Sequence, residues 1–288
     1  MKIPAYWSKA TAEDTDRDGR KASFSCWRSS DRSREEAYQS ALAAARNVLR
    51  SFLSGNRLGR YAYGETPLRE EIVERFTDSQ GELVAAVTRN AYGSLVLNTG
   101  RIMFIDLDFP PASFGESIQY FFARMFDKSA VSPEARRESE VRQRLEQPLG
   151  DNYQWSLRLY RTCAGMRALV THDLFDPAAE GTLAVLRSVG SDPLYVRLCK
   201  AQNCFRARLT PKPWRCGHTT NPVRWPTEDR AQQVRFEQWQ SQYAAKQSQY
   251  ATCRLLGTLG NDGVHPEATR IIEVHDKTTR CEERLELA

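Results

Sequence analysis

The sequence has no long hydrophobic run and no apolar N-terminus. Hydrophobic residues make up 41% of its 288 residues and charged residues 27%, yet no stretch approaches the roughly 18 consecutive apolar residues of a membrane-spanning helix. Residues 1–20 are polar and charged, without the apolar segment of a signal peptide. These absences predict a cytoplasmic protein with no membrane partner, and the length allows one large domain or two small ones.

The sequence also lacks the cysteine framework of a small disulfide-bonded scaffold. Its seven cysteines are odd in number and scattered, which in a reducing compartment indicates free thiols or metal ligands. Cys199, Cys204, Cys216 and His218 are of the types that bind zinc. Their spacing is irregular, however, and Cys199 falls on a predicted helix with apolar neighbours, where buried thiols are common. We therefore do not expect a zinc site.

The charge is only mildly positive. The net charge is +5, and arginine supplies 33 of the 41 basic residues. The planar guanidinium suits phosphate binding. Because the same bias also follows from genome composition, the net charge alone does not select a nucleic-acid partner.

The hydrophobic pattern predicts an α+β fold with a helical N-terminal part. Residues 1–30 are polar and predict a flexible arm. Ser33 and Glu36 form a capping box that starts a helix ending near Gly55. A second, short helix is predicted for residues 67–76, because proline is favoured in a first helical turn.

The middle of the chain alternates between strand and helix patterns. The predicted elements are strands at 83–88 and 94–97, a strand at 102–109, helices within 114–147, a hairpin of 155–162 and 166–172, helices at 177–189 and 192–200, a strand at 205–209 and a long helix at 228–254. From residue 102 to 209 this is the strand–helix–strand–strand–helix–strand order of a ferredoxin-like fold. We therefore predict a ferredoxin-like (RRM-like) palm core at 99–222, preceded by a helical and β segment at 31–98 and followed by a C-terminal helical extension at 223–288.

Two acids interrupt an otherwise apolar strand. Asp106 and Asp108 follow the run 102–105, which is apolar on both faces as in a central strand. Alternation places both carboxylates on one face. Two ionised carboxylates this close repel each other, and hard oxygen ligands suit Mg²⁺ or Mn²⁺, which commonly bind together with substrate phosphates. The pattern predicts a catalytic, metal-binding pair; the alternatives are a solvated loop after Ile105 and salt bridges to arginines.

The predicted hairpin carries groups that suit phosphate. Arg161 and Arg167 flank its turn, and Thr162 adds a hydroxyl group. Gly165 lets the backbone turn tightly or approach a ligand. We expect these four residues to bind nucleotide phosphates, and an ordinary hairpin turn with surface arginines is the alternative.

The densest basic and aromatic segment spans residues 205–215. Arg206 and Arg208 share one face of a strand, and Lys212 and Trp214 follow in a loop held by prolines. Cations beside aromatic rings suit contact with phosphates and stacking of bases, which predicts nucleic-acid binding. A solvated edge strand would carry the same charges to discourage pairing with other strands.

A hydrophobic strand with Asp-x-Asp, then a helix, then a hairpin carrying Thr-x-x-Gly-x-Arg resembles the catalytic core of archaeo-eukaryotic primases and primase-polymerases. The resemblance covers roughly residues 100–210. It implies that Asp106 and Asp108 bind the metal and that residues 162–167 bind the nucleotide. Arg167 stands where the family has a histidine, although His172 follows on the same predicted strand. Candidates for the family's third metal-binding acid are Asp192, Asp262 and Asp276.

These patterns lead to one leading hypothesis and two alternatives. The leading hypothesis is a nucleotidyltransferase that uses Mg²⁺ or Mn²⁺, a nucleoside triphosphate and DNA or RNA. The first alternative is a non-catalytic nucleic-acid-binding protein on a palm-like scaffold. The second is a phosphate-handling hydrolase, because the strand also resembles the opening of aspartyl phosphatases of the haloacid-dehalogenase type. Pro110 departs from that motif, and Asp262 is the candidate for its later acid.

Overall fold

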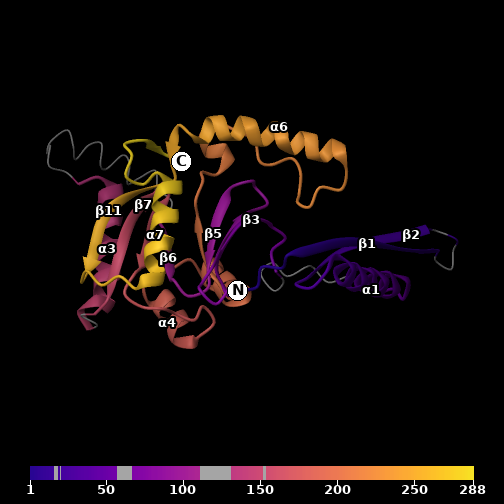
Figure 1. Ribbon diagram of the computed structural model, residues 1–288, viewed down its shortest axis with the longest axis horizontal. Coiled ribbons are helices and arrows are strands. Elements are labelled where there is room, and N and C mark those ends of the chain that lie inside the picture. Colours follow the sequence, from indigo (N-terminus) through magenta and orange to yellow (C-terminus); the bar gives the residue numbers. More distant parts are fainter. Residues whose placement is uncertain (16–18, 20, 57–66, 111–130, 152–153) are drawn as a thin grey trace.

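The computed structural model describes residues 1–15, 19, 21–56, 67–110, 131–151 and 154–288. It confirms the α+β class, since two four-stranded antiparallel sheets lie at the centre with helices around them (Figure 1). Within these residues, no helix combines the length and the apolarity needed to cross a membrane.

The first sheet carries the acid pair. Its strands, in spatial order, are β11 (Cys253–Gly260), β7 (Ser156–Thr162), β8 (Gly165–Val170) and β6 (Phe104–Asp108). The pairing of β7 with β8 confirms the predicted hairpin. Helices cover both faces. On one face, α7 (Pro266–Thr279) packs His275 against Tyr160; on the other, α3 (Pro133–Asp151) places Glu138 near Arg161.

The second sheet contains β3 (Glu71–Thr77), β4 (Leu83–Arg89), β5 (Leu95–Thr99) and β9 (Phe205–Arg208). β4, β5 and β9 confirm predicted strands. β9 hydrogen-bonds to β5 and not to β6, so the fourth strand of the expected ferredoxin-like order joins the neighbouring sheet. It still touches the first sheet, because Arg167 Nη1 donates to Arg208 O at 2.9 Å. The two sheets therefore meet beside the acid pair.

The N-terminal segment is a folded arm, so the expectation of a flexible one is wrong. β1 (Tyr6–Thr15) pairs antiparallel with β2 (Lys21–Ser30), and α1 (Arg34–Leu53) lies along the hairpin. Small apolar side chains explain why the polar sequence still packs: Ala12, Ala45 and Leu49 form a buried cluster with Phe24. Figure 1 shows this arm projecting from the central sheets. Ser33 caps α1 as predicted, since its Oγ accepts from Glu36 N at 3.1 Å, but the second half of the capping box is replaced: Ser33 N donates to Ser30 Oγ at 3.3 Å, and that hydroxyl donates to Glu36 Oε2 at 2.7 Å.

Two further predictions of helix are wrong. The expected helix at 67–76 is largely strand β3, because β-branched and aromatic residues dominate residues 72–77 and outweigh the proline signal. The late helix is shorter than predicted: α6 spans Arg230–Gln247, and β10 (Tyr250–Ala251) and β11 follow it. The segment 223–288 is therefore more than a helical extension, since β11 completes the first sheet.

The remaining elements agree with the sequence pattern. α4 (Glu180–Ser188) and α5 (Pro193–Gln202) are the predicted helices, and Asp192 caps α5. α3 confirms the later part of the helical region 114–147, whereas residues 114–130 lie outside the described residues. The short elements η1 (Pro213–Cys216) and β12 (Glu286–Leu287) complete the chain.

β6 is an edge strand of its sheet, whereas its apolar pattern predicted a central one. The chain before and within α5 covers its open edge. Ser191 Oγ and Asp192 N donate to Asp106 O at 2.9 and 3.3 Å, and Tyr195 Oη donates to Phe104 O at 2.8 Å. The carbonyls of Phe104 and Asp106 at this edge are therefore satisfied without another strand.

Gly165 lets β8 approach β6 closely. It is the cross-strand partner of Asp108, and a Cβ at this position would lie 2.1 Å from Leu107 O. The missing side chain thus makes room for the backbone that carries the acid pair.

We expect Gly165→Ala to lower the free energy of unfolding by about 3 kcal/mol, at the upper end of overpacking costs, because the methyl group would collide with backbone. Gly181→Ala is the matched control: a Cβ there has no atom within 4 Å, and alanine favours a helix by about 1 kcal/mol. Urea denaturation of both variants measures the difference. Similar stabilities for the two variants would contradict the close packing of β8 on β6.

Candidate functional site

Asp106 and Asp108 lie on one face of β6, where the buried strand reaches the surface. The Asp106 side chain is 30% exposed, and Asp108 is exposed. Leu107 between them is buried in the main core. Two carboxylates are thus neighbours at the end of an otherwise apolar strand.

Three cationic side chains surround this pair. Arg167 is the cross-strand partner of Asp106, and its Nε lies 3.6 Å from Asp106 Oδ1. Arg208 on β9 and Lys212 just after it are close enough for their charges to influence the pKa of Asp108. Neither Arg208 nor Lys212 forms an ion pair within 4.0 Å with a described residue. Both remain available to an anion.

Burial and like charges perturb the titration of this cluster. Burial, with repulsion from Asp106 and Asp192, raises the pKa of Asp108, while Lys212 and Arg208 oppose the rise. Burial and neighbouring cations lower the pKa of both Lys212 and Arg208. Because acids and bases each lie beside like charges, a divalent cation on the acids and a polyanion on the bases would relieve repulsion.

Asp192 is the candidate third acid that lies near the pair. Its N–H donates to Asp106 O, and its charge raises the pKa of Asp108. Its Oδ1 caps α5 by accepting from Tyr195 N at 2.7 Å. Asp276 lies on α7 and is linked to the pair through His275 and Arg167, and Asp262 follows β11 at the end of the sheet away from Asp108.

The carboxylates of Asp106 and Asp108 suit a cation whose remaining ligands are water or substrate phosphates. Within the part of the chain that the structure describes, no three His, Cys, Asp or Glu side chains are placed to hold one metal ion. Mg²⁺ is commonly held by one or two carboxylates, with substrate phosphates and water completing its octahedron. Asp106 and Asp108 match that arrangement.

The hairpin residues do not gather at the pair as a group. Arg161 is on the face of β7 opposite to Tyr160, where its guanidinium lies over Phe109 and its Nη1 donates to Gly165 O at 2.8 Å. It is therefore engaged in holding the hairpin turn. Thr162 shares its face with Asp108, because Gly165 pairs with both.

His172 lies beyond the other end of β8. Its ring packs against Trp155 and Phe175 with centroid separations of 4.9 and 5.7 Å, and burial lowers its pKa. The structure therefore places it in an aromatic cluster remote from Asp108.

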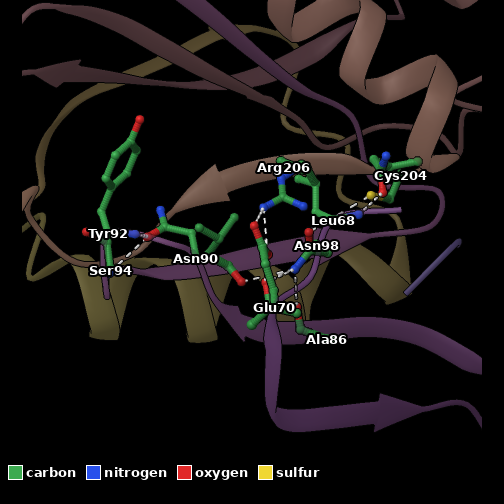
Figure 2. Close-up of polar contacts among 12 residues, drawn as sticks. Leu68, Glu70, Ala86, Asn90, Tyr92, Ser94, Asn98, Cys204 and Arg206 are labelled. Atoms are coloured by element: carbon green, nitrogen blue, oxygen red, sulfur yellow. Dashed lines mark hydrogen bonds and ion pairs between the residues drawn. The ribbon is translucent and has the colours of Figure 1, made fainter. Parts of the chain in front are cut away.

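Arg206 has a structural partner. Figure 2 shows its guanidinium directed at Glu70, whose two carboxylate oxygens each lie 2.8 Å from Arg206 Nη2. Glu70 is buried and also accepts from Thr88 Oγ1 at 2.5 Å, and Asn98 Nδ2 donates to that hydroxyl at 2.9 Å. This network ties the segment before β3 to β4, β5 and β9. Arg206 thus has a structural role in this ion pair, whereas Arg208, two residues later, has no such partner among the described residues.

Trp214 lies at the surface, 47% exposed. Its ring stands edge-on to Tyr92 at a centroid separation of 5.2 Å, and Lys212 Nζ lies 5.6 Å from its centroid. Lys212 thus places a cation beside an exposed aromatic ring, as predicted. The charge of the same lysine also acts on Asp108 of the acid pair.

The four possible zinc ligands are divided between different parts of the protein. Cys199 belongs to the main core, whereas Cys216 packs with Trp239 and Tyr243 of α6. His218 stacks on Trp239 at a centroid separation of 5.6 Å.

A buried histidine directly behind the site, His275, was not among the site residues predicted from the sequence. His275 Nε2 lies 3.3 Å from Arg167 Nη1, and its Nδ1 lies 2.8 Å from Asp276 Oδ1. Tyr160 Oη and Arg158 Nη2 also donate to Asp276, at 2.7 and 2.5 Å. A signal existed: His275 continues the buried stripe of α7 through Ala268 and Ile271, which marks it as inward-facing.

A cavity of about 850 Å³ adjoins the pair. Asp106, Arg167 and Arg208 line it together with residues of the arm, the second sheet and the segment 221–236. Its volume lies in the range of small-molecule sites, about 300–1,000 Å³. Asp106 of the pair therefore borders a space large enough for a substrate, whereas Asp108 is not among the residues that line it.

Comparison with protein-family models, curated proteins and solved structures finds no match to this chain. Its function is inferred below from the chemistry of the site.

We expect the His275 network to make stability depend on pH. Burial, with the nearby charges of Arg167 and Arg158, lowers the pKa of His275 to about 4, while Asp276 opposes this; an unfolded histidine titrates near 6.5. The unfolded chain therefore gains the proton first as the pH falls, and about 3 kcal/mol of stability is lost between about pH 6.5 and 4. Urea denaturation of wild type and His275→Gln across this range tests this: the variant should show a flatter profile, and an identical slope would refute it.

Glu70→Ala should leave the Arg206 charge buried without its counter-ion and lower the free energy of unfolding by about 3–5 kcal/mol. Glu180→Ala, which removes the exposed ion pair with Arg187, is the matched control and should change stability little. Thermal or urea denaturation measures both. If the two variants lose equally little, the Glu70–Arg206 contact does not stabilise the fold.

Proposed function

We propose that the chain is a metal-dependent nucleotidyltransferase of primase-polymerase type, with Asp106 and Asp108 as its metal-binding acids. The observation that carries this proposal is the placement of the two acids on one strand face beside Arg208 and Lys212. Nucleotidyl transfer requires a divalent cation near the reacting phosphate and positive charge on the triphosphate. Here the two carboxylates offer ligands for the cation, and Arg208 and Lys212 offer positive charge for the triphosphate.

The strand order supports a palm-like core. In a ferredoxin-like sheet the first strand neighbours the third, the third neighbours the second, and the fourth flanks the first. β6, β8 and β7 follow this order, with α3 between β6 and β7 in sequence. β9 lies beside β6 but pairs with β5, and β11 extends the sheet next to β7. The proposed palm is therefore a modified one that shares its fourth strand with the second sheet.

The side chains have separate roles in this proposal. Asp106 and Asp108 hold Mg²⁺ or Mn²⁺, which when bound neutralises phosphate charge and stabilises the charge that develops in transfer. Arg208 and Lys212 bind phosphate oxygens through charge-assisted hydrogen bonds. Arg167 orients Asp106, since its own guanidinium is fixed by Arg208 O and lies beside His275.

A non-catalytic nucleic-acid-binding protein is the second candidate. It is favoured by the lack of a third metal-coordinating side chain among the described residues, and by the position of Arg167 as an internal counter-ion of Asp106. In that case Arg208 and Lys212 contact the phosphate backbone, and the acids are dispensable.

The phosphate-handling hydrolase has less support. Its later acid, Asp262, follows Asn261, whose N–H donates to Trp155 O at 3.0 Å. This is the end of the first sheet at which β7 begins, whereas Asp108 lies beside the end at which β7 finishes. One phosphate group cannot contact both acids.

Metal and nucleotide together should stabilise the folded chain. We expect Mn²⁺ with a nucleoside triphosphate to raise the melting temperature, because a ligand at 100 times its Kd adds about 2.7 kcal/mol. Asp106→Asn removes a metal ligand with little change of volume, so it should abolish both this shift and primer extension. Differential scanning fluorimetry and an extension assay measure the two effects.

Asp262→Asn makes the same chemical change at the other end of the sheet and should leave both results unchanged. The shift should also weaken as the pH falls toward the raised pKa of Asp108, because a proton then competes with the cation. A shift that survives Asp106→Asn would contradict the assignment. No shift in the wild type, with salt-dependent binding of nucleic acid, would favour the second candidate.

A further inference from the structure

The cavity beside the acid pair also contains aromatic side chains that the proposed transfer does not use. Seven aromatic residues are among those described as lining it; two are Tyr92 and Tyr195, and we call the other five, Trp7, Trp27, Tyr38, Trp225 and Phe236, the aromatic chamber. They come from β1, β2, α1, the segment before α6, and α6 itself. Elements far apart in the sequence thus each contribute an aromatic ring to the same cavity.

The register of the arm places two of these tryptophans on one face. β1 and β2 pair Trp7 with Ser29 and Lys9 with Trp27, so Trp7, Lys9 and Trp27 share a face. All three line the cavity. The guanidinium of Arg69 lies 4.0 Å from the Trp27 ring centroid, which forms a cation–π platform. The arm is therefore part of the cavity wall.

Trp7 carries a polar group that has no hydrogen-bond partner among the described residues. Its side chain is buried, 9% exposed, and the unpaired atom within this part of the chain is Nε1. Buried indole N–H groups are normally paired. The atom itself is enclosed, so Trp7 contributes its ring to the cavity wall and not an accessible donor.

The cavity wall is positively charged. Eight cationic side chains and four carboxylates occur among the described lining residues. The cations are Lys9, Arg34, Arg69, Arg89, Arg167, Arg206, Arg208 and Arg224, and the acids are Glu70, Glu71, Asp106 and Glu228. The excess of cations suits a polyanion that reaches beyond Arg208.

We propose that the aromatic chamber binds the unpaired bases of a single-stranded nucleic acid, with its phosphates on the surplus cations of the cavity. A mononucleotide has one base to stack, whereas five rings from five elements line the chamber. A duplex keeps its base faces stacked inside, where these rings cannot reach them. Stacking on aromatic rings within a positive groove is the usual basis of sequence-tolerant binding to single strands. This inference rests on the proposed function, for which it supplies the strand partner.

The test is binding of a short fluorescein-labelled oligothymidylate, followed by anisotropy in EDTA without nucleoside triphosphate. Trp27→Leu keeps apolar bulk but removes the ring face, and should weaken binding about tenfold. Trp27→Phe keeps a ring and should restore most of the affinity. Trp225→Leu tests the same point without altering the arm. The matched control is Tyr6→Ala, since Tyr6 neighbours Trp7 but does not line the cavity.

Each contrary outcome overturns the inference. These are wild-type affinity in both leucine variants, no binding by the wild type, equal binding of a duplex, and displacement of the oligonucleotide by a nucleoside triphosphate at equal concentration. Failure here is separable from failure of the proposed function, because the assay contains no metal. Chamber-dependent binding without primer extension would remove the transferase proposal alone. Extension without chamber-dependent binding would remove this inference alone.

Discussion

One buried guanidinium, that of Arg167, connects the parts of the protein that meet at the acid pair. Its backbone belongs to β8, its Nε faces Asp106 at 3.6 Å, and its Nη1 donates to Arg208 O on β9 and lies 3.3 Å from His275 on α7. A buried charge is costly unless other groups compensate it. The groups that compensate the Arg167 charge therefore include Asp106 itself. The position of this acid is fixed by the same contacts that stabilise the buried guanidinium.

The same contact explains the unusual place of β9. This strand offers Arg208 O to the first sheet while its hydrogen bonds go to β5 in the second. Arg206 and Arg208 share a face of β9, yet their partners differ. Glu70 neutralises Arg206 inside the second sheet, whereas Arg208 reaches the acid pair and the cavity. One short strand thus supplies a cation that is paired inside the fold, Arg206, and a second one that lines the cavity, Arg208.

Local patterns predicted the elements whose hydrophobic period is regular, such as β4, β5, the β7–β8 hairpin and α1, and alternation alone placed Asp106 and Asp108 together. The β1–β2 hairpin of the arm was missed because small side chains, alanines above all, make up much of the cluster that packs it against α1. β3 was missed because the proline signal of a helix start was weighted above its β-branched residues. Contacts between distant residues carry no local signal. Arg206 and Glu70 are 136 positions apart, and Arg167 and His275 are 108 apart, so the structural contacts of these two arginines became visible only in the fold.

The most direct test of the proposed metal site is anomalous diffraction from crystals grown with Mn²⁺ and a non-hydrolysable nucleoside triphosphate. The proposal predicts a manganese peak beside the carboxylates of Asp106 and Asp108, with the triphosphate directed toward Arg208 and Lys212. A triphosphate bound elsewhere, or bound here with no manganese at the two carboxylates, would contradict the assignment of this pair as a nucleotidyl-transfer centre.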